Sequence, residues 1–387
     1  MKIEEVHANI VLDSRGEETI AIDVNHCRTI APSGKSKGRY EAPAYKKNPM
    51  EDSEFINKIA LKSFPEIDSF EDLEKIEKKF KKNIGANTLF ALEASILKAL
   101  AKSKRLELWQ LLNVAARVFP RIISNTIGGG AHSSITKIKP DFQEFLVTCN
   151  KNPALASVVN RKAHENAEAI LKNLSSNSPK KNDENAWTTD EDNESVLEIM
   201  KNIQENVFDE TGTSIAVGLD CAASQFYKNG SYNYLNRKAT RGKKEQIEYI
   251  SMLAKKYDLF YIEDPLDEED FEGFAELVKK CNCLIVGDDL TVTNFKRTEK
   301  AIKMEAITGI IIKPNQTGSL LEVKKIIDLC QKFGIKTIMS HRSGESVDDT
   351  IADLAFAWQC DFIKVPVVGR ERFAKVDRLM RIEQGMK

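Results

Sequence analysis

The sequence has no apolar run close to the roughly 20 residues that a membrane-spanning helix needs, so we expect no membrane partner. It also has no excess of one charge, because 57 Lys and Arg balance 58 Asp and Glu. Such a balance does not indicate a surface for nucleic acid. The first ten residues, MKIEEVHANI, lack the apolar core of a secretory signal.

Cysteine is present, but not in a pattern typical of disulfides or zinc sites. The seven cysteines are scattered, odd in number, and contain no C-x-x-C pair. Free thiols suit a reducing compartment, so we expect a cytoplasmic protein. The 387 residues are 42% hydrophobic, which is enough for a sizeable core.

The first region of the chain has the pattern of a small mixed domain. Apolar and polar residues alternate within 1–30, which predicts a small antiparallel sheet. Charged amphipathic helices are expected over 53–64 and 70–82, and a strongly apolar helix over 86–103. Residues 1–115 therefore predict an N-terminal α+β domain.

The second region, 116–387, has a different pattern. From about residue 210, six short apolar runs recur, at 215–219, 259–262, 284–287, 310–312, 337–340 and 362–363, with helical stretches between them. From Glu263 onward, the residues that end these runs are 23 to 28 residues apart. This spacing predicts parallel strands that close into a (β/α)8-type barrel. Residues 173–195 are polar and rich in helix breakers, which favours a solvated linker, although Trp187 argues mildly against it.

Each predicted strand ends in a charged or polar residue. In barrels of this type the active site lies at the C-terminal ends of the strands, so these side chains would face one another. In chain order they are Asp220, Glu263, Asp288, Lys313, His341, Arg342, Ser343 and Lys364.

Three of these residues, Asp220, Glu263 and Asp288, are acids that would repel one another without a cation. Oxygen ligands select a hard ion, so we expect Mg²⁺. The alternative is that each acid caps the helix after its strand. For a single acid both interpretations stay open, whereas three at successive strand ends favour the metal.

Lys313 follows the apolar run 310–312, where lysine is rare. Burial and a nearby Mg²⁺ would both lower its pKa and give an amine that accepts a proton. The alternative is a lysine that extends to the barrel rim. His341, Arg342, Ser343 and Lys364 supply charge and donors that suit a phosphate, unless Arg342 is a surface residue and Ser343 a helix cap.

Several longer motifs are together specific. They are LDSRG (12–16), PSGKSKG (32–38), GGGAH (128–132), GLDCAAS (218–224), IEDP (262–265), GDDLTVTN (287–294), IIKPNQTGS (311–319) and SHRSGES (340–346). On these motifs the chain resembles the enolase family, most of all its archaeal branch, over nearly its whole length. The resemblance implies the reversible dehydration of 2-phosphoglycerate to phosphoenolpyruvate in glycolysis. It also implies a homodimer, or in some members an octamer.

The resemblance implies two Mg²⁺ ions, one structural and one that arrives with the small phosphorylated acid substrate. The ligands of the tighter ion would be Asp220, Glu263 and Asp288. Ser36, on a closing loop, would complete the second metal site. Lys313 would be the general base.

The general acid implied by the resemblance is Glu184, a residue that its own polar loop does not point to. Gln143 and Glu144 would support this acid and contact substrate. His132 would close over the ligand on a mobile loop, although a lone histidine after a glycine run is more often structural. The remaining substrate contacts would be His341, Arg342, Ser343 and Lys364.

Some positions depart from the family pattern. The acid loop, 182–185, lacks the two usual glycines, Lys35 stands in the closing loop, and Gln225 replaces a common Glu. Three hypotheses stay open: a working enolase, a related lyase or isomerase for another acid, and a non-catalytic enolase-like protein. The first is favoured because every acid, base and metal position is filled.

Overall fold

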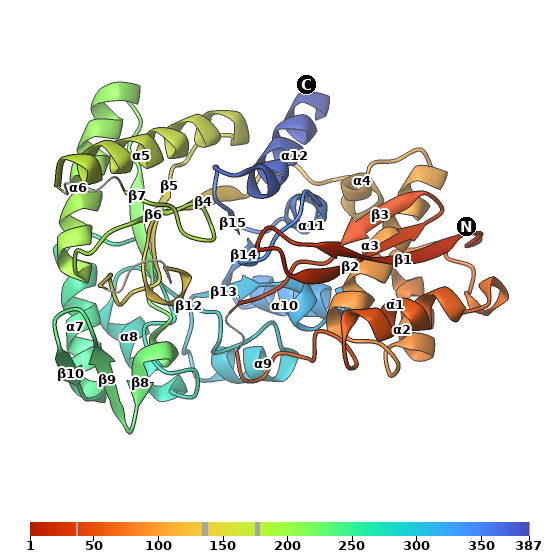
Figure 1. Cartoon of the computed structure of the whole chain (residues 1–387), viewed down its shortest axis with the longest axis horizontal. Coiled ribbons are helices and arrows are strands. Elements are labelled where there is room, and N and C mark those ends of the chain that lie inside the picture. The colour runs from red at the N-terminus through yellow and green to blue at the C-terminus, as the bar shows by residue number, and fades with distance from the viewer. Residues whose placement is uncertain (36–37, 134–137, 175–178, 387) are drawn as a thin grey trace.

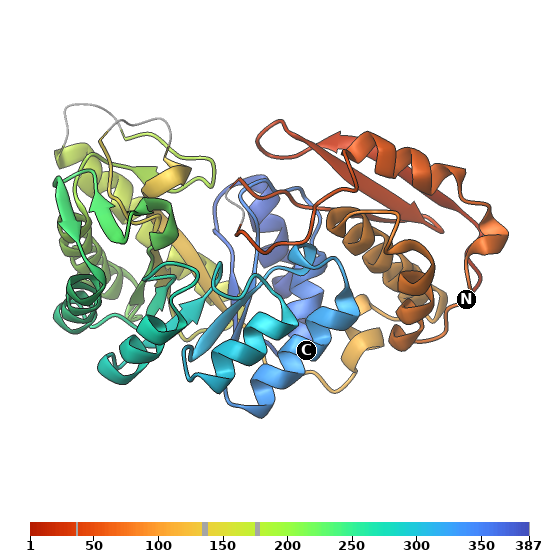
Figure 2. The ribbon, with the colours of Figure 1, turned by 90° about the horizontal axis from the view of Figure 1, so that it is seen from below.

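The computed structural model describes residues 1–35, 38–133, 138–174 and 179–386. A small N-terminal domain of sheet and helices lies against one side of a large barrel surrounded by helices (Figure 1). The view from below shows helices of this domain between its sheet and the barrel (Figure 2). Among the described residues, no helix is both long and apolar enough to cross a membrane.

The predicted N-terminal sheet is confirmed as three antiparallel strands in the order β1-β2-β3. Their bounds are Val6–Leu12, Glu18–Val24 and Cys27–Ile30. Helix α3 (Ala86–Ser103) packs on this sheet and is almost entirely buried, as its apolar sequence predicts. Its neighbours are α1 (Pro49–Lys58), α2 (Leu73–Phe80) and α4 (Leu108–Asn113).

The predicted bounds of the first helix are wrong. Helix α1 begins earlier, because the Asn48 side chain accepts a hydrogen bond from the Glu51 N–H at 2.8 Å and Pro49 occupies the first helical position. It ends at Lys58, and 61–63 form a separate 3-10 turn. The second predicted helix likewise divides into a 3-10 turn and α2.

The barrel is closed, because β15 pairs with β4 and completes a ring of eight strands. These strands are β4 (Arg121–Gly128), β5 (Glu144–Thr148), β7 (Ala216–Asp220), β11 (Tyr261–Glu263), β12 (Leu284–Gly287), β13 (Gly309–Ile312), β14 (Lys336–Ser340) and β15 (Phe362–Lys364). The six strands predicted from the apolar runs are confirmed. Their inner side chains form a dry core of Ile123, Leu146, Tyr261, Val286, Ile311, Ile338 and Phe362.

The predicted strands of the barrel run parallel to one another, but a strand outside that prediction does not. Strand β5 runs antiparallel to both of its neighbours, β4 and β7. A parallel neighbour needs a crossover connection, usually a helix, whereas the described part of the segment between β4 and β5 forms only the 3-10 helix η3 (Gly130–His132).

Helices surround the barrel on its outer face (Figure 1). Their bounds are α5 (Pro153–Leu174), α6 (Asn193–Thr211), α7 (Lys243–Lys256), α8 (Phe271–Lys280), α9 (Phe295–Lys303), α10 (Leu320–Lys332), α11 (Thr350–Ala357) and α12 (Arg370–Met386). Four short strands complete the fold: β6 (Trp187–Thr188), β8 (Tyr227–Lys228), β9 (Ser231–Tyr234) and β10 (Ala239–Arg241).

The interpretation of 173–195 as a solvated linker is also wrong. Helices α5 and α6 occupy its two ends, and β6 pairs with β4 of the barrel. Glu184 is 2% exposed and Trp187 is 6% exposed. Asn182 and Thr188 are buried as well, and their side chains hydrogen-bond to backbone groups of this loop, which composition alone does not reveal.

The N-terminal domain reaches the barrel mouth through its loop after β3. Ser33 and Gly344 exchange two backbone hydrogen bonds of 2.8 Å. A Cβ on Gly344 would lie 2.0 Å from Asp13 Oδ2, so only glycine fits this contact. The motifs that begin at 12, 32 and 340 therefore form one junction between the two domains.

Candidate active site

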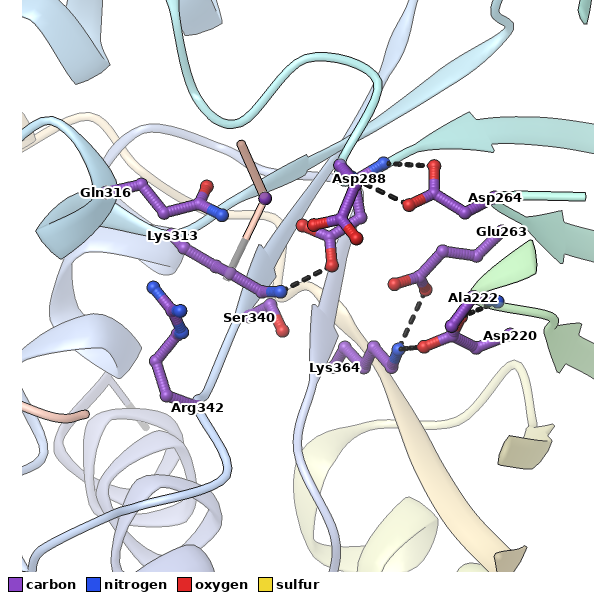
Figure 3. Close-up of polar contacts among 12 residues, drawn as sticks. Asp220, Ala222, Glu263, Asp264, Asp288, Lys313, Gln316, Ser340, Arg342 and Lys364 are labelled. Atoms are coloured by element: carbon purple, nitrogen blue, oxygen red, sulfur yellow. Dashed lines mark hydrogen bonds and ion pairs between the residues drawn. The ribbon is translucent and has the colours of Figure 1, made fainter. Parts of the chain in front are cut away.

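Three acids stand at one level of the barrel mouth because their strands are neighbours in register. Glu144 on β5 pairs with Asp220 on β7, and Asp220 pairs with Glu263 on β11. Lys364, at the end of β15, contacts all three, and Figure 3 shows its contacts with Asp220 and Glu263. Its Nζ lies 2.8 Å from Glu144, 2.9 Å from Asp220 and 2.8 Å from Glu263.

This cluster contains more potential negative than positive charge. Burial raises the pKa of Glu263 well above its usual value, Asp220 adds to this effect, and Lys364 opposes it. Burial lowers the pKa of Lys364, but the three acids outweigh burial and raise it well above its usual value. The lysine therefore stays charged. A proton or a further cation is still needed to balance the remaining negative charge of the three acids.

Asp288 and Lys313 form a second pair, at the ends of β12 and β13. Lys313 Nζ donates to Asp288 Oδ2 at 2.5 Å (Figure 3). Asp264, which sequence reasoning missed, accepts the backbone N–H of Asp288 at 2.9 Å and that of Asp289 at 2.7 Å. Carboxylate oxygens of Asp264, Asp288 and Asp289 all lie within 4.8 Å of one another, an arrangement that could hold a metal ion.

The pKa that burial and Mg²⁺ are together expected to lower at Lys313 lies above its usual value in the chain without metal. Burial and Arg342 do lower this pKa, but Asp288, Glu263 and Asp289 outweigh them, and the pKa lies above its usual value. Burial lowers this pKa as expected, but the negative charge of the nearby acids, which the expectation did not include, raises it more. Lys313 is thus an ammonium until another cation shares the charge of Asp288.

The positive side of the cleft is built jointly by the two domains. Arg342 forms two-pronged hydrogen bonds of 3.1 Å with Glu41 of the N-terminal domain. Ser343 Oγ accepts the Lys35 N–H at 2.7 Å. A Cβ on Gly34 would lie 1.8 Å from Arg342 Nη2. Any larger residue at position 34 would therefore push the loop and this arginine apart.

Glu184 enters the cleft from the loop that the sequence leaves unexplained. Asn182 Oδ1 accepts the N–H of Glu184 at 2.9 Å and that of Ala186 at 3.0 Å. Asn185 adopts φ 65°, a left-handed conformation that asparagine tolerates well. The two asparagines thus form a fixed turn where the family pattern has glycines.

His341 faces Glu184, with 3.8 Å between Nε2 and Oε2. Burial lowers the pKa of His341 well below its usual value, and the nearby Arg372 lowers it further. The histidine is therefore neutral near pH 7. On the opposite wall, Gln143 Nε2 donates to Asp220 Oδ2 at 3.3 Å, and Gln225 Nε2 donates to Gln143 Oε1 at 3.0 Å.

The cleft brings together most of the residues predicted from the sequence. They are Gln143, Glu144, Glu184, Asp220, Asp288, Lys313, His341, Arg342, Ser343 and Lys364, and Glu263 joins them through Lys364. Ser36 lies outside the described residues. His132 belongs to η3, but its side chain is not described.

The cleft also contains residues that the sequence reasoning did not select: Ala222, Gln225, Asp264, Asp289 and Ser340. Asp264 and Asp289 each directly follow a predicted acid, so the doubled acids in IEDP and GDDL were an available indication. Gln225 was noted as a departure from the family pattern, but its contact with Gln143 depends on the fold.

Comparison with known proteins agrees with this architecture. The family model described as "Enolase, N-terminal domain" matches residues 3–112, and "Enolase, C-terminal TIM barrel domain" matches residues 116–387. An enolase of Methanocorpusculum labreanum is 39% identical, with 99% of each chain covered. An enolase of Archaeoglobus fulgidus is 37% identical over 100% of this chain and 98% of its own. With both domains matched in order and archaeal relatives matched from end to end, the chain belongs to the enolase family.

Proposed function

We propose that this chain catalyses the reversible dehydration of 2-phospho-D-glycerate to phosphoenolpyruvate, which makes it a hydro-lyase, phosphopyruvate hydratase. One observation carries this proposal: Lys313 and Glu184 line one cleft together with the acid cluster and the cationic loop. The family match and the relatives named enolase support it. The described part of the chain offers no comparable support for another acid substrate or a non-catalytic role.

We assign the base step to Lys313. The proton at C2 of the substrate lies next to a carboxylate, so it is weakly acidic and its removal adds negative charge to that carboxylate. Strand β13 and the 2.9 Å hydrogen bond from the Lys313 N–H to Thr293 Oγ1 hold this residue in place. In its neutral form, the Lys313 amine takes the C2 proton.

We assign the acid step to Glu184, which protonates the leaving hydroxyl at C3. Its burial and the Asn182 turn hold the carboxyl in one place. Neutral His341 beside it adds no positive charge that would keep Glu184 ionised. Gln143 and Glu144 support this side of the site.

The residues present fit Mg²⁺. The donors are carboxylates, which suit a hard cation, and Asp288 Oδ1 is buried with no hydrogen-bond partner among the described residues. Asp220, Glu263 and Asp288 would hold the tighter ion, and Ser36 would complete the site of a second ion that arrives with substrate. Bound there, Mg²⁺ would stabilise the negative charge that develops on the substrate carboxylate.

The anionic groups of the substrate would meet His341, Arg342, Ser343 and Lys364. Arg342 would release the Glu41 carboxylate and bind an anionic group of the substrate in its place. Its guanidinium already makes the two-pronged hydrogen bonds that suit carboxylates and phosphates. His132 would close over the ligand. These roles rest on the family resemblance and on the place of the residues around the cleft.

We further infer a glycolytic enzyme of the cytoplasm that forms a homodimer or octamer. We also infer a functional division between residues 1–115 and 116–387. The balanced charge, with 57 basic and 58 acidic residues, gives no support for a nucleic-acid partner.

A direct assay tests the proposed function. Purified protein with 2-phosphoglycerate should form phosphoenolpyruvate, measured by its absorbance, when Mg²⁺ is present, and should stop when a chelator removes the metal. Lys313→Ala should be inactive under the same conditions. Product formation that is equally fast without Mg²⁺, or none at all with it, would reject the proposal.

A further inference from the structure

We propose that Arg372 is a positioning residue that holds the acid loop, and with it Glu184, against the substrate-binding loop at 340–346. This inference rests on the proposed function. Arg372 lies on the final helix rather than at a strand end, and it acts on only one of the two proton transfers.

Arg372 connects two loops with one nitrogen. It lies in the first turn of α12 and is 1% exposed. Its Nη2 donates to the carbonyl of Asp183 at 2.9 Å and to the carbonyl of Ser343 at 2.8 Å. Asp183 directly precedes Glu184, so the same guanidinium sets the place of the proposed acid relative to the substrate contacts.

The charge of Arg372 acts on the same place. His341 lies between the two loops and faces Glu184 at 3.8 Å. After burial, Arg372 is the largest influence that lowers the pKa of His341, and Lys364 and Lys375 act in the same direction while Glu144 opposes them. Arg372 thus helps to keep this histidine uncharged beside the proposed acid.

The base side of the site is held by other contacts. Lys313 follows β13, its side chain pairs with Asp288, and its N–H donates to Thr293. Neither hydrogen bond of Arg372 reaches this group. Loss of Arg372 should therefore disturb the step at C3 and spare the step at C2.

Helix α12 offers a matched control, Lys375, one turn beyond Arg372. It is also 1% exposed, pairs with Glu345 at 2.6 Å and donates to the carbonyl of Ser346 at 2.5 Å. It therefore holds the 340–346 loop as Arg372 does, but its hydrogen bonds and ion pair go to Ser346, Glu371 and Glu345 and not to the acid loop. Removing either side chain leaves buried hydrogen-bond acceptors without their cationic donor, so the two variants should lose comparable stability.

The test separates the two proton transfers. Exchange of the C2 hydrogen of 2-phosphoglycerate in D₂O, followed by NMR, reports the Lys313 step, and phosphoenolpyruvate absorbance reports the whole dehydration. In Arg372→Met, dehydration should fall by about 100-fold, a usual contribution of a general acid, while C2 exchange falls far less. In Lys375→Met, both rates should change by the same factor.

Arg372→Lys keeps the charge and provides a second variant if the methionine form does not fold. It should show the same split between the two rates, but smaller. Equal loss of both rates in the Arg372 variants, or the same split in Lys375→Met, would overturn the inference. Wild-type protein that neither exchanges nor dehydrates the substrate would overturn the proposed function, and this inference with it.

Discussion

Lys364 and Glu263 form an ion pair of 2.8 Å at the centre of the barrel mouth. Because Lys364 also pairs with Asp220 and Glu144, its ammonium balances part of the charge of a buried acid cluster in the chain without metal. We therefore predict that a cation bound at this cluster raises folding stability.

We expect Lys364→Met to be destabilised by about 3 kcal/mol without Mg²⁺, because it leaves buried acids without their partner. Mg²⁺ should restore part of this loss, so the metal should raise the free energy of unfolding more in the variant than in wild type. Urea unfolding with and without Mg²⁺ measures both values. An unchanged wild-type stability in the variant would contradict the assigned role.

Lys313→Ala should lower both C2 exchange and dehydration by about 1,000-fold, because no other group is assigned to accept the C2 proton. Lys313→Arg is the control: it keeps a positive charge beside Asp288 but cannot become a neutral base. Both variants should therefore be inactive, while the arginine form keeps wild-type stability. C2 exchange that survives in the alanine form would reject Lys313 as the base.

Gly34→Ala should weaken substrate binding, because the new Cβ would lie 1.8 Å from Arg342 Nη2 and displace the guanidinium from its place. We expect a rise in KM of about 10-fold, the equivalent of one lost hydrogen bond to a charged group, with little change in kcat. Gly385→Ala, at a glycine with no atom within 4 Å of its Cβ, is the control and should behave as wild type. Equal KM values in both variants would contradict the close approach.

The stability of the acid loop should depend on pH through His164. Its Nε2 lies 2.8 Å from the Asn185 carbonyl, and Trp187 Nε1 donates to its Nδ1 at 3.2 Å, so the neutral ring is the one that fits. Burial lowers the pKa of His164 below its usual value, and it outweighs the opposing effect of the hydrogen bond to the Asn185 carbonyl. Lys181 adds a smaller lowering effect, and Glu168 and Glu165 oppose it.

Because the folded pKa is depressed, this stability is fully present above the unfolded value, about 6.5, and is lost as the pH falls through the folded pKa. The free energy of unfolding of wild type should therefore decrease between about pH 7 and pH 5. His164→Gln should show a smaller decrease, the remainder arising from other groups such as His341. Denaturant unfolding over this range checks the slope, and identical slopes in the two proteins would exclude His164 as a contributor.

Cys281 should be the cysteine that reacts first with iodoacetamide near neutral pH. The neighbouring Cys283 thiol, more than the nearby Ser251 and Lys280, lowers the pKa of Cys281 below its usual value although burial opposes this. Cys27 is half-buried like Cys281, but burial raises its pKa, so it is an internal control. Mass spectrometry of labelled peptides gives the rates, which Cys283→Ala should slow at Cys281 alone.

The sequence alone was sufficient to locate six barrel strands and the groups that follow them. Strands such as β12 are local features: an apolar run of fixed length ends at a charged residue, and β12 has the bounds that its run predicts. Since parallel strand ends meet at one face, the meeting of Asp288, Lys313 and Lys364 at one mouth followed from that pattern.

Only the tertiary structure decided the direction of β5, the burial of Glu184 and the contacts of Arg372. These depend on groups far apart in the chain: the carbonyls of Asp183 and Ser343 meet on one guanidinium because α12 packs beside both loops. A polar loop such as 182–188 has the same composition whether water or the protein satisfies its hydrogen bonds. The same holds for Lys313, whose pKa depends on which acids the fold places around it.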